Sequence, residues 1–385
     1  MDFALTSEQE MLKTSARKFL ESNFTSDYVR EMCENSQGYE SEMWKKIAEL
    51  GWMSLTIPEE YGGLGLTFRD LGLVLHEMGK VVMPGPFFST VVLAAELIKL
   101  AGSEEQKAHL LEKIASGKLI ATVAFYEEDA EWGAKGIKLT ADKKDDYYFL
   151  QGTKLFVPDA HIADLIIVAA RTENSSVASQ GISLFLLNPK TEGVQIERLP
   201  TMDQGRKLCA VSFTNVAVSS TEILGEVGKG WPSLENMLIR ANIALGQEML
   251  GGGEKVLEIA TDYAKIRVQF GQPIGSYQAI KHKCAEMLLQ LESSRSIAEY
   301  AAWTVNGNPC EASKAASIVK TYVGNMYRRA AAATLQILGG IGFSWEHDIH
   351  LYYKRALASE AMFGDTPFHL EFLASQWDKN VLRRG

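Results

Sequence analysis

The spacing of apolar residues divides the chain into three parts. Up to about residue 117, apolar residues recur at spacings of three and four, which is typical of amphipathic helices. From about 118 to 228 the chain carries short runs rich in β-branched residues, separated by Gly, Asp, Asn and Pro. Helical spacing returns after Gly230-Trp231-Pro232 and continues almost to the C-terminus. The strand-like runs are Leu119–Phe125, Tyr147–Leu150, Leu165–Ala170, Ile182–Leu187, Val194–Leu199 and Ala210–Val216.

This order of helices, strands and helices predicts an α+β protein. We expect an N-terminal helical domain over 1–117, a mostly antiparallel β-sheet domain over 118–228, and a C-terminal four-helix-bundle domain over 229–385. A length of 385 residues suits two or three domains with a substantial core.

The stretch Tyr263–His282 combines basic, aromatic and turn-forming residues. A helix carrying Arg267 is predicted to break at Gly271, and a second helix to begin near Ser276, whose hydroxyl suits an N-cap. At such a break the guanidinium can bind a diphosphate through paired hydrogen bonds, and Phe270 offers a flat face to a purine. A helix–turn–helix corner with a surface arginine is the alternative.

The same stretch closely resembles the Arg-x-Gln-Phe-Gly…Gln signature of the acyl-CoA dehydrogenase family, in which it binds FAD. The resemblance implies FAD contacts for Arg267, Gln269, Phe270 and Gln278. It extends to the order of helices, strands and helices, and in that family FAD lies between the sheet domain and the C-terminal bundle. FAD is therefore the implied cofactor.

A second stretch, Gln336-Ile337-Leu338-Gly339-Gly340, ends a predicted helix in glycines. Missing Cβ atoms let a bulky anion approach the backbone, although a plain C-cap is the commoner outcome. The stretch resembles the family's Gln-x-x-Gly-Gly element, which implies FAD contacts for Gln336, Gly339 and Gly340. In the family both elements reach across a dimer interface to a neighbouring subunit's flavin. The resemblance thus implies an oligomer, either a homotetramer or a heterotetramer with a paralogous chain.

Composition limits the classes of partner, of metal site and of cellular location that the chain suits. The 48 acidic and 39 basic residues give a net charge of −9, which argues against a nucleic-acid partner. The four cysteines show neither paired nor metal-ligand spacing, so we expect reduced thiols and no metal site. The N-terminus lacks the regions of a signal peptide, and no apolar run approaches the roughly 20 residues that span a bilayer. We expect a cytoplasmic protein.

The predicted sheet domain departs from the family pattern in two places. Phe125–Trp132 stands where the family has a Thr-Glu-Pro-Gly-Ala-Gly-Ser-Asp-like loop that contacts flavin and acyl-CoA. A carboxylate about 6 Å from a diphosphate costs roughly 3 kcal/mol at an effective dielectric constant near 20, so these acids must point to solvent or the ligand is held differently. Farther on, Phe156 can still cover a flavin ring face, but Pro158 has neither a hydroxyl nor an N–H and loses a flavin contact.

The family's usual base is a glutamate in a Tyr-Glu-Gly-Thr loop, and Phe363 occupies its place here. Phe363 is therefore expected to contact the substrate rather than to remove a proton. Asp365 lies two residues on and is an alternative base. Its other reading is structural, because Asp365 or Thr366 suits a helix N-cap with Pro367 in the first turn.

A carboxylate on another helix, Glu248, is the preferred candidate for the base. It is the only charged member of an apolar stripe on the helix before Tyr263. A carboxylate on an apolar face finds a partner or takes a raised pKa, and a raised pKa suits a base for an acidified C–H. The alternative is a buried ion pair with a lysine or arginine of another helix. The stripe consists of Leu234, Leu238, Ala241, Leu245, Glu248, Gly252, Val256 and Ile259.

The resemblance implies a reaction as well as a cofactor. The base would take the α-proton of an acyl-CoA thioester while the β-hydrogen leaves as hydride to flavin, which gives a 2-enoyl-CoA. Electrons would then pass to an electron-transfer flavoprotein. The backbone N–H of Phe363 would polarise the thioester carbonyl, and Arg240 is a candidate for binding the CoA moiety.

Small residues near Glu248 predict a bulky, branched or cyclic acyl group, although such residues equally permit close helix packing. They are Ala241, Ala244, Gly251 and Gly252. Two other functions stay open. The chain could be a non-catalytic subunit that completes a partner chain's FAD site, since its helical motifs look intact and its sheet-domain contacts do not. It could also be a flavin enzyme of the same fold with different acyl-CoA chemistry.

Overall fold

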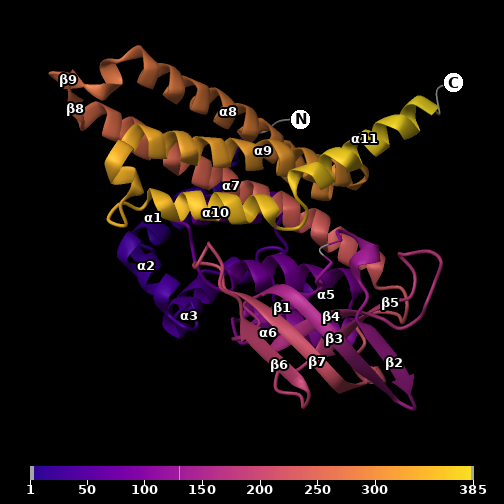
Figure 1. The fold of residues 1–385 in the computed structure, drawn as a ribbon. Helices are drawn as coiled ribbons and strands as arrows, with labels where there is room; N and C mark the ends of the chain where they lie inside the picture. Colours follow the sequence, from indigo (N-terminus) through magenta and orange to yellow (C-terminus); the bar gives the residue numbers. More distant parts are fainter. Residues whose placement is uncertain (1–3, 130, 383–385) are drawn as a thin grey trace. The chain divides into compact units, whose positions relative to one another are not determined.

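The computed structural model describes residues 4–129 and 131–382, with side chains described up to residue 376 (Figure 1). The predicted order of helices, strands and helices is confirmed. Helix α6 ends at Ala115 and helix α7 begins at Trp231, while the predicted domain borders themselves stay predictions. The chain forms two compact units. Unit 1 comprises Met1–Arg30, Phe68–Met83 and Asn242–Gly385, and unit 2 comprises Glu31–Thr67 and Pro84–Ala241.

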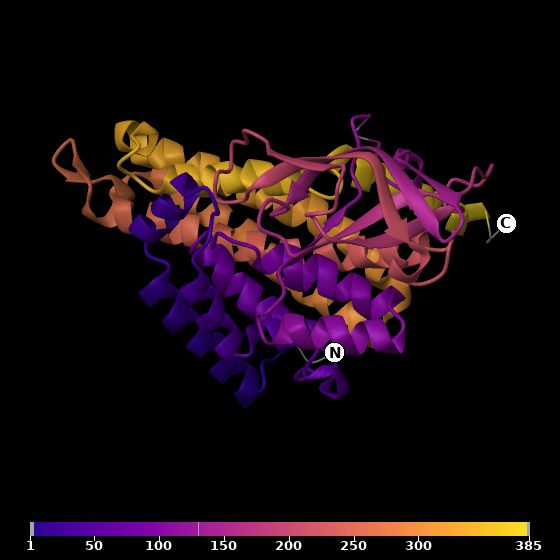
Figure 2. The same cartoon turned by 90° about the horizontal axis from the view of Figure 1, so that it is seen from below.

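Unit 2 is built on a seven-stranded sheet of order β1-β4-β2-β3-β7-β6, with β5 paired to β4. β1 and β4 are parallel, β2 meets β4 in one parallel pair, and the other pairs are antiparallel. The mostly antiparallel sheet is therefore confirmed, and Figure 2 shows the twist of its strands. The strands are β1 (Ala121–Ala124), β2 (Thr140–Lys144), β3 (Tyr147–Pro158), β4 (Leu165–Arg171), β5 (Ile182–Leu187), β6 (Val194–Arg198) and β7 (Leu208–Ser219).

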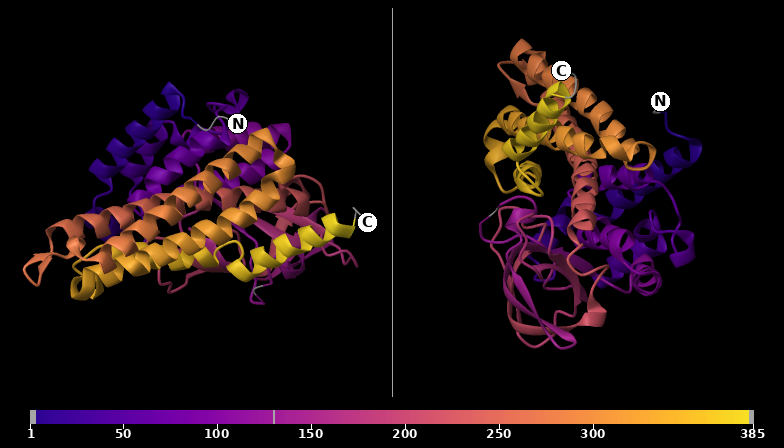
Figure 3. Two further views of the ribbon diagram at one scale, coloured as in Figure 1. Left: turned by 90° about the horizontal axis from the view of Figure 1, so that it is seen from above. Right: turned by 90° about the vertical axis from the view of Figure 1, so that its right-hand side faces the viewer.

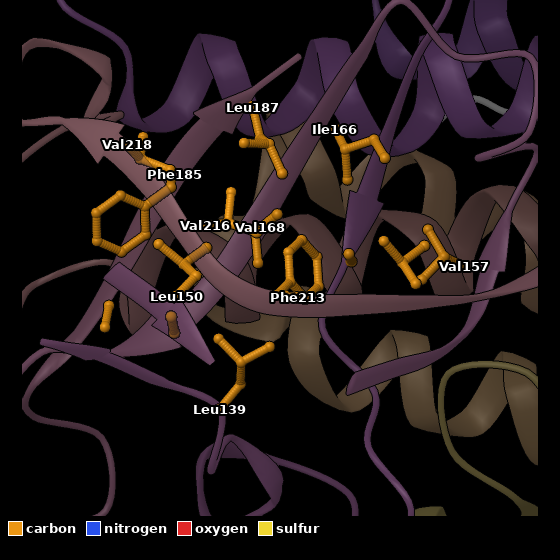
Figure 4. Packing of buried hydrophobic residues seen from close by; sticks show 14 of the residues in the cluster. Leu139, Leu150, Val157, Ile166, Val168, Phe185, Leu187, Phe213, Val216 and Val218 are labelled. Carbon is orange, nitrogen blue, oxygen red and sulfur yellow. The ribbon is translucent and has the colours of Figure 1, made fainter. Parts of the chain in front are cut away.

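The core of unit 2 is a cluster of apolar side chains from these strands (Figure 4). Leu150, Val168, Phe185 and Phe213 gather in it from β3, β4, β5 and β7, and each is at most 1% exposed. Every residue of β5 and nearly every residue of β4 is buried, which explains why both strands read as unbroken apolar runs. The core fixes β3 and the segment after β1, which carry the candidate residues of this unit.

The helices of unit 2 include a π-helix, which the sequence pattern did not predict. The π-helical segment η3 (Phe88–Ala95) is buried throughout and continues directly into α5 (Glu96–Ala101). A π-helical turn shifts the residues that follow around the helix axis and often marks a functional site. Here it precedes Glu96, a carboxylate that is fully buried. The remaining helices are α3 (Ser41–Glu49) and α6 (Glu104–Ala115), with 3-10 turns η1 (Trp52–Ser54), η2 (Glu59–Tyr61), η4 (Ala134–Gly136) and η5 (Ser220–Glu222).

Unit 1 is helical apart from one hairpin. α8, α9 and α10 run alongside one another, with the hairpin at one end and α11 at the other (Figure 3). Two helices cross the border between the units: α2 (Ser26–Glu34) and α7 (Trp231–Ile266). The other elements are α1 (Ser7–Asn23), α4 (Phe68–Lys80), β8 (Val268–Gln269), β9 (Gln272–Pro273), η6 (Ile274–Ser276), α8 (Gln278–Gly307), α9 (Pro309–Leu338), η7 (Gly339–Phe343), α10 (Ile349–Ala361) and α11 (Thr366–Leu382).

The glycines of α7 serve close helix packing. A Cβ on Gly251 would lie 1.8 Å from the carbonyl oxygen of His76 on α4, and a Cβ on Gly252 would lie 2.4 Å from the Tyr327 ring on α9. The expectation that Gly251 and Gly252 leave space for a bulky acyl group is therefore wrong, because neighbouring helices occupy that space. The alternative reading, close packing of helices, holds at both positions.

Candidate functional site

A β-hairpin lies between α7 and α8, where the sequence predicted only a break between helices. α7 ends one residue before Arg267, and β8 pairs with β9 so that Gln269 faces Gln272. The two loop residues, Phe270 and Gly271, have φ of 52° and 82°. Two successive positive φ values fit a type I′ turn, whose usual residues are Asn-Gly. The hairpin therefore holds a bulky aromatic residue in the left-handed region.

The start of α8 also differs from the prediction. Ser276 is not the N-cap, because its hydroxyl donates to the Pro273 carbonyl at 2.7 Å and the N-cap residue is Tyr277. The Tyr277 hydroxyl donates to the Gln269 carbonyl at 3.0 Å. This bond connects the start of α8 to the hairpin, and it therefore helps to orient the hairpin loop.

The side chains predicted to bind FAD from this region point away from their own chain. Phe270 is 93% exposed, and Arg267, Gln269 and Gln278 are exposed as well. The Arg267 guanidinium makes no hydrogen bond or ion pair with any residue that the structure describes. A guanidinium and an aromatic face without partners in their own chain are suited to an anionic, aromatic ligand.

In the glycine stretch at the end of α9, Gly339 adopts a backbone conformation that ends the helix, and Gly340 lies beside open space. Gly339 is the C-cap of α9, with φ 63° and ψ −135°, a conformation that only glycine adopts readily. Gly340 is exposed, and a Cβ there would meet no atom within 4 Å. Gln336, one turn earlier, is exposed too. Figures 1 and 3 show this end of α9 and the hairpin toward the same end of unit 1.

In unit 2, Phe156 lies at a bulge in β3. Its φ is 54°, and the register between β3 and β7 shifts between Lys154 and Val157. Bulges of this kind redirect a side chain, and the Phe156 ring is 48% exposed. Pro158 is buried, and its carbonyl accepts a hydrogen bond from the Thr122 hydroxyl at 2.6 Å. Phe156 is thus presented outward, whereas Pro158 contributes to the core of the strand.

The acidic segment after β1 turns one carboxylate inward. Glu127 forms an ion pair with the fully buried ammonium of Lys154 at 2.6 Å. Its Oε1 also accepts from the backbone N–H groups of Lys138 and Leu139 at 2.9 and 3.0 Å. Burial lowers the pKa of Lys154 to about 8, against the attraction of the carboxylate. The pair pins the segment after β1 to the strand that carries Phe156.

The other acids of that segment face solvent. Glu128, Asp129 and Glu131 are exposed, and Asp129 pairs with the exposed Lys138. Ala130 lies outside the described residues. The charge near any bound phosphate is therefore lower than the sequence suggests, because Glu127 is neutralised by Lys154 and its neighbours are hydrated.

The turn between α10 and α11 carries Phe363, which has φ 57° and is 5% exposed. The Asn242 amide on α7 donates to the Phe363 carbonyl at 3.2 Å. The buried ammonium of Lys320 on α9 donates to the carbonyls of Ser359 and Glu360 at 2.8 and 2.7 Å. These carbonyls belong to the last turn of α10, which has no further helix to satisfy them. Buried polar groups thus set the backbone of this turn.

Asp365 has the capping role that was its alternative. Its Oδ1 accepts a hydrogen bond from the Phe368 backbone N–H at 3.0 Å, and α11 begins at the next residue, Thr366. A carboxylate at the N-cap also suits the positive end of the helix dipole. To serve as a base, Asp365 would have to give up this cap.

Glu248 has the ion pair that was its alternative. Its Oε1 lies 2.8 Å from Nη1 of Arg355 on α10, and the two side chains are 8% and 3% exposed. The sequence analysis did not identify Arg355 as the partner. A signal was available: Arg355 lies three residues after Tyr352 and one before Ala356, on the buried face of α10. The function of Glu248 as a base stays a prediction.

Arg240, the residue predicted to bind CoA, is engaged within unit 2. Its Nη1 lies 2.6 Å from Oε2 of Glu96, whose other oxygen pairs with Lys99 at 2.5 Å and accepts from the Thr56 hydroxyl at 3.0 Å. The two cations lower the pKa of the fully buried Glu96 carboxyl in spite of its burial. Arg240 thus compensates a buried charge, and CoA binding by Arg240 stays a prediction.

A buried histidine, which the sequence analysis did not single out, lies against the Phe363 turn. The Nδ1 of His369 is 3.1 Å from the Ser317 hydroxyl, and a Cβ on Gly364 would lie 2.8 Å from its Nε2. Burial, together with the nearby Lys320 ammonium, lowers the pKa of His369 to about 4. The imidazole is therefore neutral at pH 7.

We expect the protein to lose stability between pH 6.5 and pH 4 in part through His369. Its folded pKa of about 4 lies below the unfolded value near 6.5, so the unfolded state binds more protons in this window. The contribution is complete above pH 6.5 and lost by pH 4, a difference of about 3 kcal/mol. Urea unfolding should show this loss for the wild type and a flatter pH profile for His369→Gln. The exposed His282→Gln control should follow the wild type, whereas a His369→Gln profile parallel to wild type would contradict the assignment.

Three phenylalanines predicted for the site share one unusual property. Among the described residues, seven non-glycine residues have positive φ, and Phe156, Phe270 and Phe363 are three of them. For a bulky side chain this conformation is strained, and it persists where the surrounding structure enforces it. Such strain concentrates at ligand-binding sites. From the sequence, Phe156 and Phe270 are predicted to offer ring faces to flavin and purine, and Phe363 to stand at the place of the family's glutamate base.

Several classes of site receive no support from the described residues. No helix in that part of the chain is long and apolar enough to cross a membrane. No cluster of His, Cys, Asp and Glu there could hold a metal ion. Cys33, Cys209, Cys284 and Cys310 are all free thiols.

Comparison with known proteins covers nearly the whole chain. Residues 6–118, 122–216 and 228–377 match the N-terminal, middle and C-terminal domains of acyl-CoA dehydrogenases. The bovine mitochondrial short/branched chain specific acyl-CoA dehydrogenase is 30% identical over 375 residues, which is 96% of this chain and 85% of the relative.

Solved structures agree with this match. Butyryl-CoA dehydrogenase from Megasphaera elsdenii is 28% identical, with a TM-score of 0.90 and coverage of 98% of this chain and 100% of the other. A chain of the ChsE4–ChsE5 complex from Mycobacterium tuberculosis is 25% identical, with a TM-score of 0.89 and coverage of 98% and 99%.

Proposed function

Because the chain belongs to the acyl-CoA dehydrogenase family of FAD-dependent oxidoreductases, we propose that it takes part in oxidising an acyl-CoA thioester to a 2-enoyl-CoA. The observation that carries the proposal is the strained, left-handed backbone of Phe156, Phe270 and Phe363. By the family resemblance, these positions correspond to a residue that covers the flavin ring, to the FAD-binding signature and to the loop of the usual glutamate base.

The described residues fit FAD. In unit 1, the Arg267 guanidinium, which has no partner among the described residues, suits a diphosphate, Phe270 suits an adenine face, and the open backbone at Gly340 leaves room for a large anion. In unit 2, Phe156 offers an exposed ring. Gln269, Gln278, Gln336 and Gly339 complete the proposed cofactor set. When bound, FAD supplies an acceptor for the hydride that leaves the β-carbon.

The chain's own contribution at the substrate centres on the Phe363 turn. We propose that the Phe363 backbone N–H polarises the thioester carbonyl, which acidifies the α-C–H. The turn is held for this purpose by Asn242 on its carbonyl and by Lys320 at the end of α10. A hydrogen-bond donor fixed before the substrate arrives is more effective than one that must reorganise.

Both carboxylates considered as the base hold other partners. Glu248 would have to release Arg355 before it could accept a proton, and Asp365 would have to release the start of α11. Glu248 is our candidate for the proton acceptor in a chain that catalyses alone. We also propose that the acyl group is bulky, branched or cyclic. With the base on α7, the Phe363 turn carries no carboxylate and can line the acyl pocket. The packed glycines of α7 no longer support that preference.

The occupied carboxylates favour a second candidate, a subunit that completes a neighbour's site. The Arg267 guanidinium has no hydrogen-bond or ion-pair partner among the described residues, the Phe270 ring is 93% exposed, and one similar structure is a chain of a two-component complex. In this role Arg267, Phe270 and Gly340 would contact FAD held by a paralogous chain. An electron-transfer flavoprotein as acceptor and a tetrameric, cytoplasmic assembly belong to both versions of the proposal.

The visible spectrum of the purified chain tests the proposal. Expressed alone, a catalytic chain should carry oxidised flavin near one per chain and bleach with an acyl-CoA. A chain that is colourless alone and turns yellow with a second subunit would support the partner-subunit role. A chain that binds no flavin in either condition would contradict both.

Arg267→Ala should lower flavin retention after gel filtration in whichever assembly carries flavin, with an unchanged melting temperature. The guanidinium supports nothing within the described chain, so only a ligand contact is lost. Lys265→Ala is the matched control, because Lys265 is also exposed and pairs only with the exposed Asp262 among described residues. Equal flavin content in Arg267→Ala and Lys265→Ala would remove Arg267 from the site.

A further inference from the structure

Asn242 on α7 is a buried polar residue of which only one of the two polar side-chain atoms, Nδ2, has a partner among the described residues. It is 4% exposed, and its Nδ2 donates to the Phe363 carbonyl at 3.2 Å. A carbonyl oxygen can only accept, so the amide must turn its NH2 group toward Phe363. The orientation of the amide is therefore fixed by chemistry, and its Oδ1 must point elsewhere.

The Oδ1 of Asn242 is buried and has no hydrogen-bond partner among the described residues. Buried acceptors without donors are rare in folded proteins, and each one is unfavourable for the fold. The hydrogen bond from Nδ2 to the Phe363 carbonyl accounts for one half of the amide. The buried Oδ1 is explained by a donor that arrives with a ligand.

The surrounding turn shows how specific this acceptor is. The Lys320 ammonium donates to two carbonyls, the Asp365 carboxylate caps α11, and Nδ1 of His369 meets the Ser317 hydroxyl. These groups build a frame around the Phe363 backbone with partners from the chain itself. Asn242 belongs to the same frame but keeps an accepting atom unused, two residues along α7 from Arg240.

We propose that Asn242 is a ligand-positioning residue: its Nδ2 holds the Phe363 turn, and its Oδ1 accepts a hydrogen bond from a neutral N–H or O–H donor of the bound ligands. This inference rests on the proposed function. Two donors of that chemistry accompany the reaction, an amide N–H of the pantetheine arm of acyl-CoA and a ribityl hydroxyl of FAD. One side chain thereby links the Phe363 turn to the ligand that the turn serves.

The signal was present in the sequence. Asn242 follows Leu238 by four residues and precedes Leu245 by three, so it lies on the flank of the same apolar stripe as Glu248. Glu248 stands out on the stripe by its charge, whereas Asn242 carries none. A neutral polar residue on a buried stripe needs a partner as much as a charged one does.

The test compares Asn242→Leu with wild type in the flavin-loaded assembly. Loss of one hydrogen bond should weaken binding of butyryl-CoA or 2-methylbutyryl-CoA, measured by calorimetry, about 2- to 12-fold. The melting temperature of the ligand-free protein should change by no more than about 4 °C in either direction, because leucine removes both the unpartnered acceptor and the donor to the Phe363 carbonyl. A residue with a merely structural role would leave thioester binding and flavin retention unchanged, and that result would overturn the proposal.

Two further variants separate the donors and the proposals. Asn242→Asp keeps an acceptor but turns a second oxygen toward the Phe363 carbonyl, so it should lower the melting temperature and release the turn. Asn236→Leu, on an exposed position of α7, is the matched control and should change neither quantity. A faster loss of flavin from Asn242→Leu assigns the donor to FAD, and weaker thioester binding with normal flavin content assigns it to acyl-CoA. If wild type binds no CoA thioester at all, the proposed function fails, whereas equal thioester binding and equal flavin retention by wild type and Asn242→Leu defeat the Asn242 assignment alone.

Discussion

Replacing Glu248 by glutamine is expected to lower the free energy of unfolding by about 3–5 kcal/mol, because it leaves the Arg355 guanidinium buried without its anion. Urea unfolding of the purified variant measures this loss. Glu258→Gln on the same helix is the matched control, since its side chain is 41% exposed and pairs with Lys80 and Lys255. The loss at Glu258 should be about 1 kcal/mol or less, because Glu258 is partly exposed and Lys80 keeps its pair with Glu254 at 2.6 Å. A double variant, Glu248→Leu with Arg355→Met, should recover much of the lost stability, because it removes both buried charges.

The same Glu248→Gln preparation decides the role of Glu248 as a base. General bases typically contribute about 10²–10⁴-fold to rate. If Glu248 removes the proton, flavin bleaching by acyl-CoA in a stopped-flow experiment should slow by at least the lower figure while FAD and thioester remain bound. A stable variant that bleaches slowly would contradict the structural reading of the ion pair. A destabilised variant that bleaches at the wild-type rate would exclude Glu248 as the base.

Glu127→Gln is expected to have an effect of similar size in unit 2. The substitution removes the carboxylate that pairs with the fully buried Lys154 ammonium. Among the described residues, the ammonium then keeps only its hydrogen bond to the Phe125 carbonyl at 3.2 Å. The expected loss is about 3–5 kcal/mol near neutral pH. Glu127 also accepts from two backbone N–H groups, which a glutamine oxygen can still do. The loss therefore comes mainly from the unpaired cation.

The pH dependence of the Glu127→Gln variant provides a second signature. The folded pKa of Lys154 is already lowered to about 8 from 10.5, and removal of Glu127 lowers it further. The unfolded state then binds more protons between these values, so stability should recover as pH rises from 8 toward 10.5. Lys138→Met, which breaks an exposed pair with Asp129 in the same segment, should change stability by about 1 kcal/mol or less at any pH in this range. A Glu127→Gln variant that shows no recovery would contradict the assignment.

The sequence predicts the secondary structure best where a whole element is buried and its residues are therefore apolar. β4 and β5 are apolar along their whole length, and both were predicted close to their observed bounds. β2 was missed because four of its five residues, Thr140, Asp142, Lys143 and Lys144, are exposed and polar, and its strand character comes from pairing with β3. The π-helix η3 was equally hidden, because its eight buried residues fit any buried helix.

For the candidate site, the sequence predicts which residue types take part but not which residues pair with one another. Arg267, Phe270 and Gly340 could be selected because a cation, a ring and a glycine each suggest their own chemistry. The hairpin that carries Phe270 depends on a Phe-Gly type I′ turn, which local statistics disfavour. Glu248 could be recognised as a carboxylate that needs a partner, but the partner, Arg355, lies 107 residues away in sequence. Long-range pairing of this kind is decided by tertiary packing.

The left-handed phenylalanines also bear on how this protein can be engineered. Phe156, Phe270 and Phe363 are positions where glycine or asparagine would relax the backbone. A screen for thermostability would therefore tend to select replacements at the exposed Phe156 and Phe270, since natural proteins usually have stabilising substitutions within reach. Phe363 is 5% exposed, so its replacement would lose more in packing than it gained in backbone strain. Each replacement would delete an aromatic face from the proposed flavin or substrate contacts. In this chain, substitutions that relieve backbone strain at Phe156 and Phe270 would remove proposed flavin contacts. Stabilising substitutions should therefore be sought at other positions.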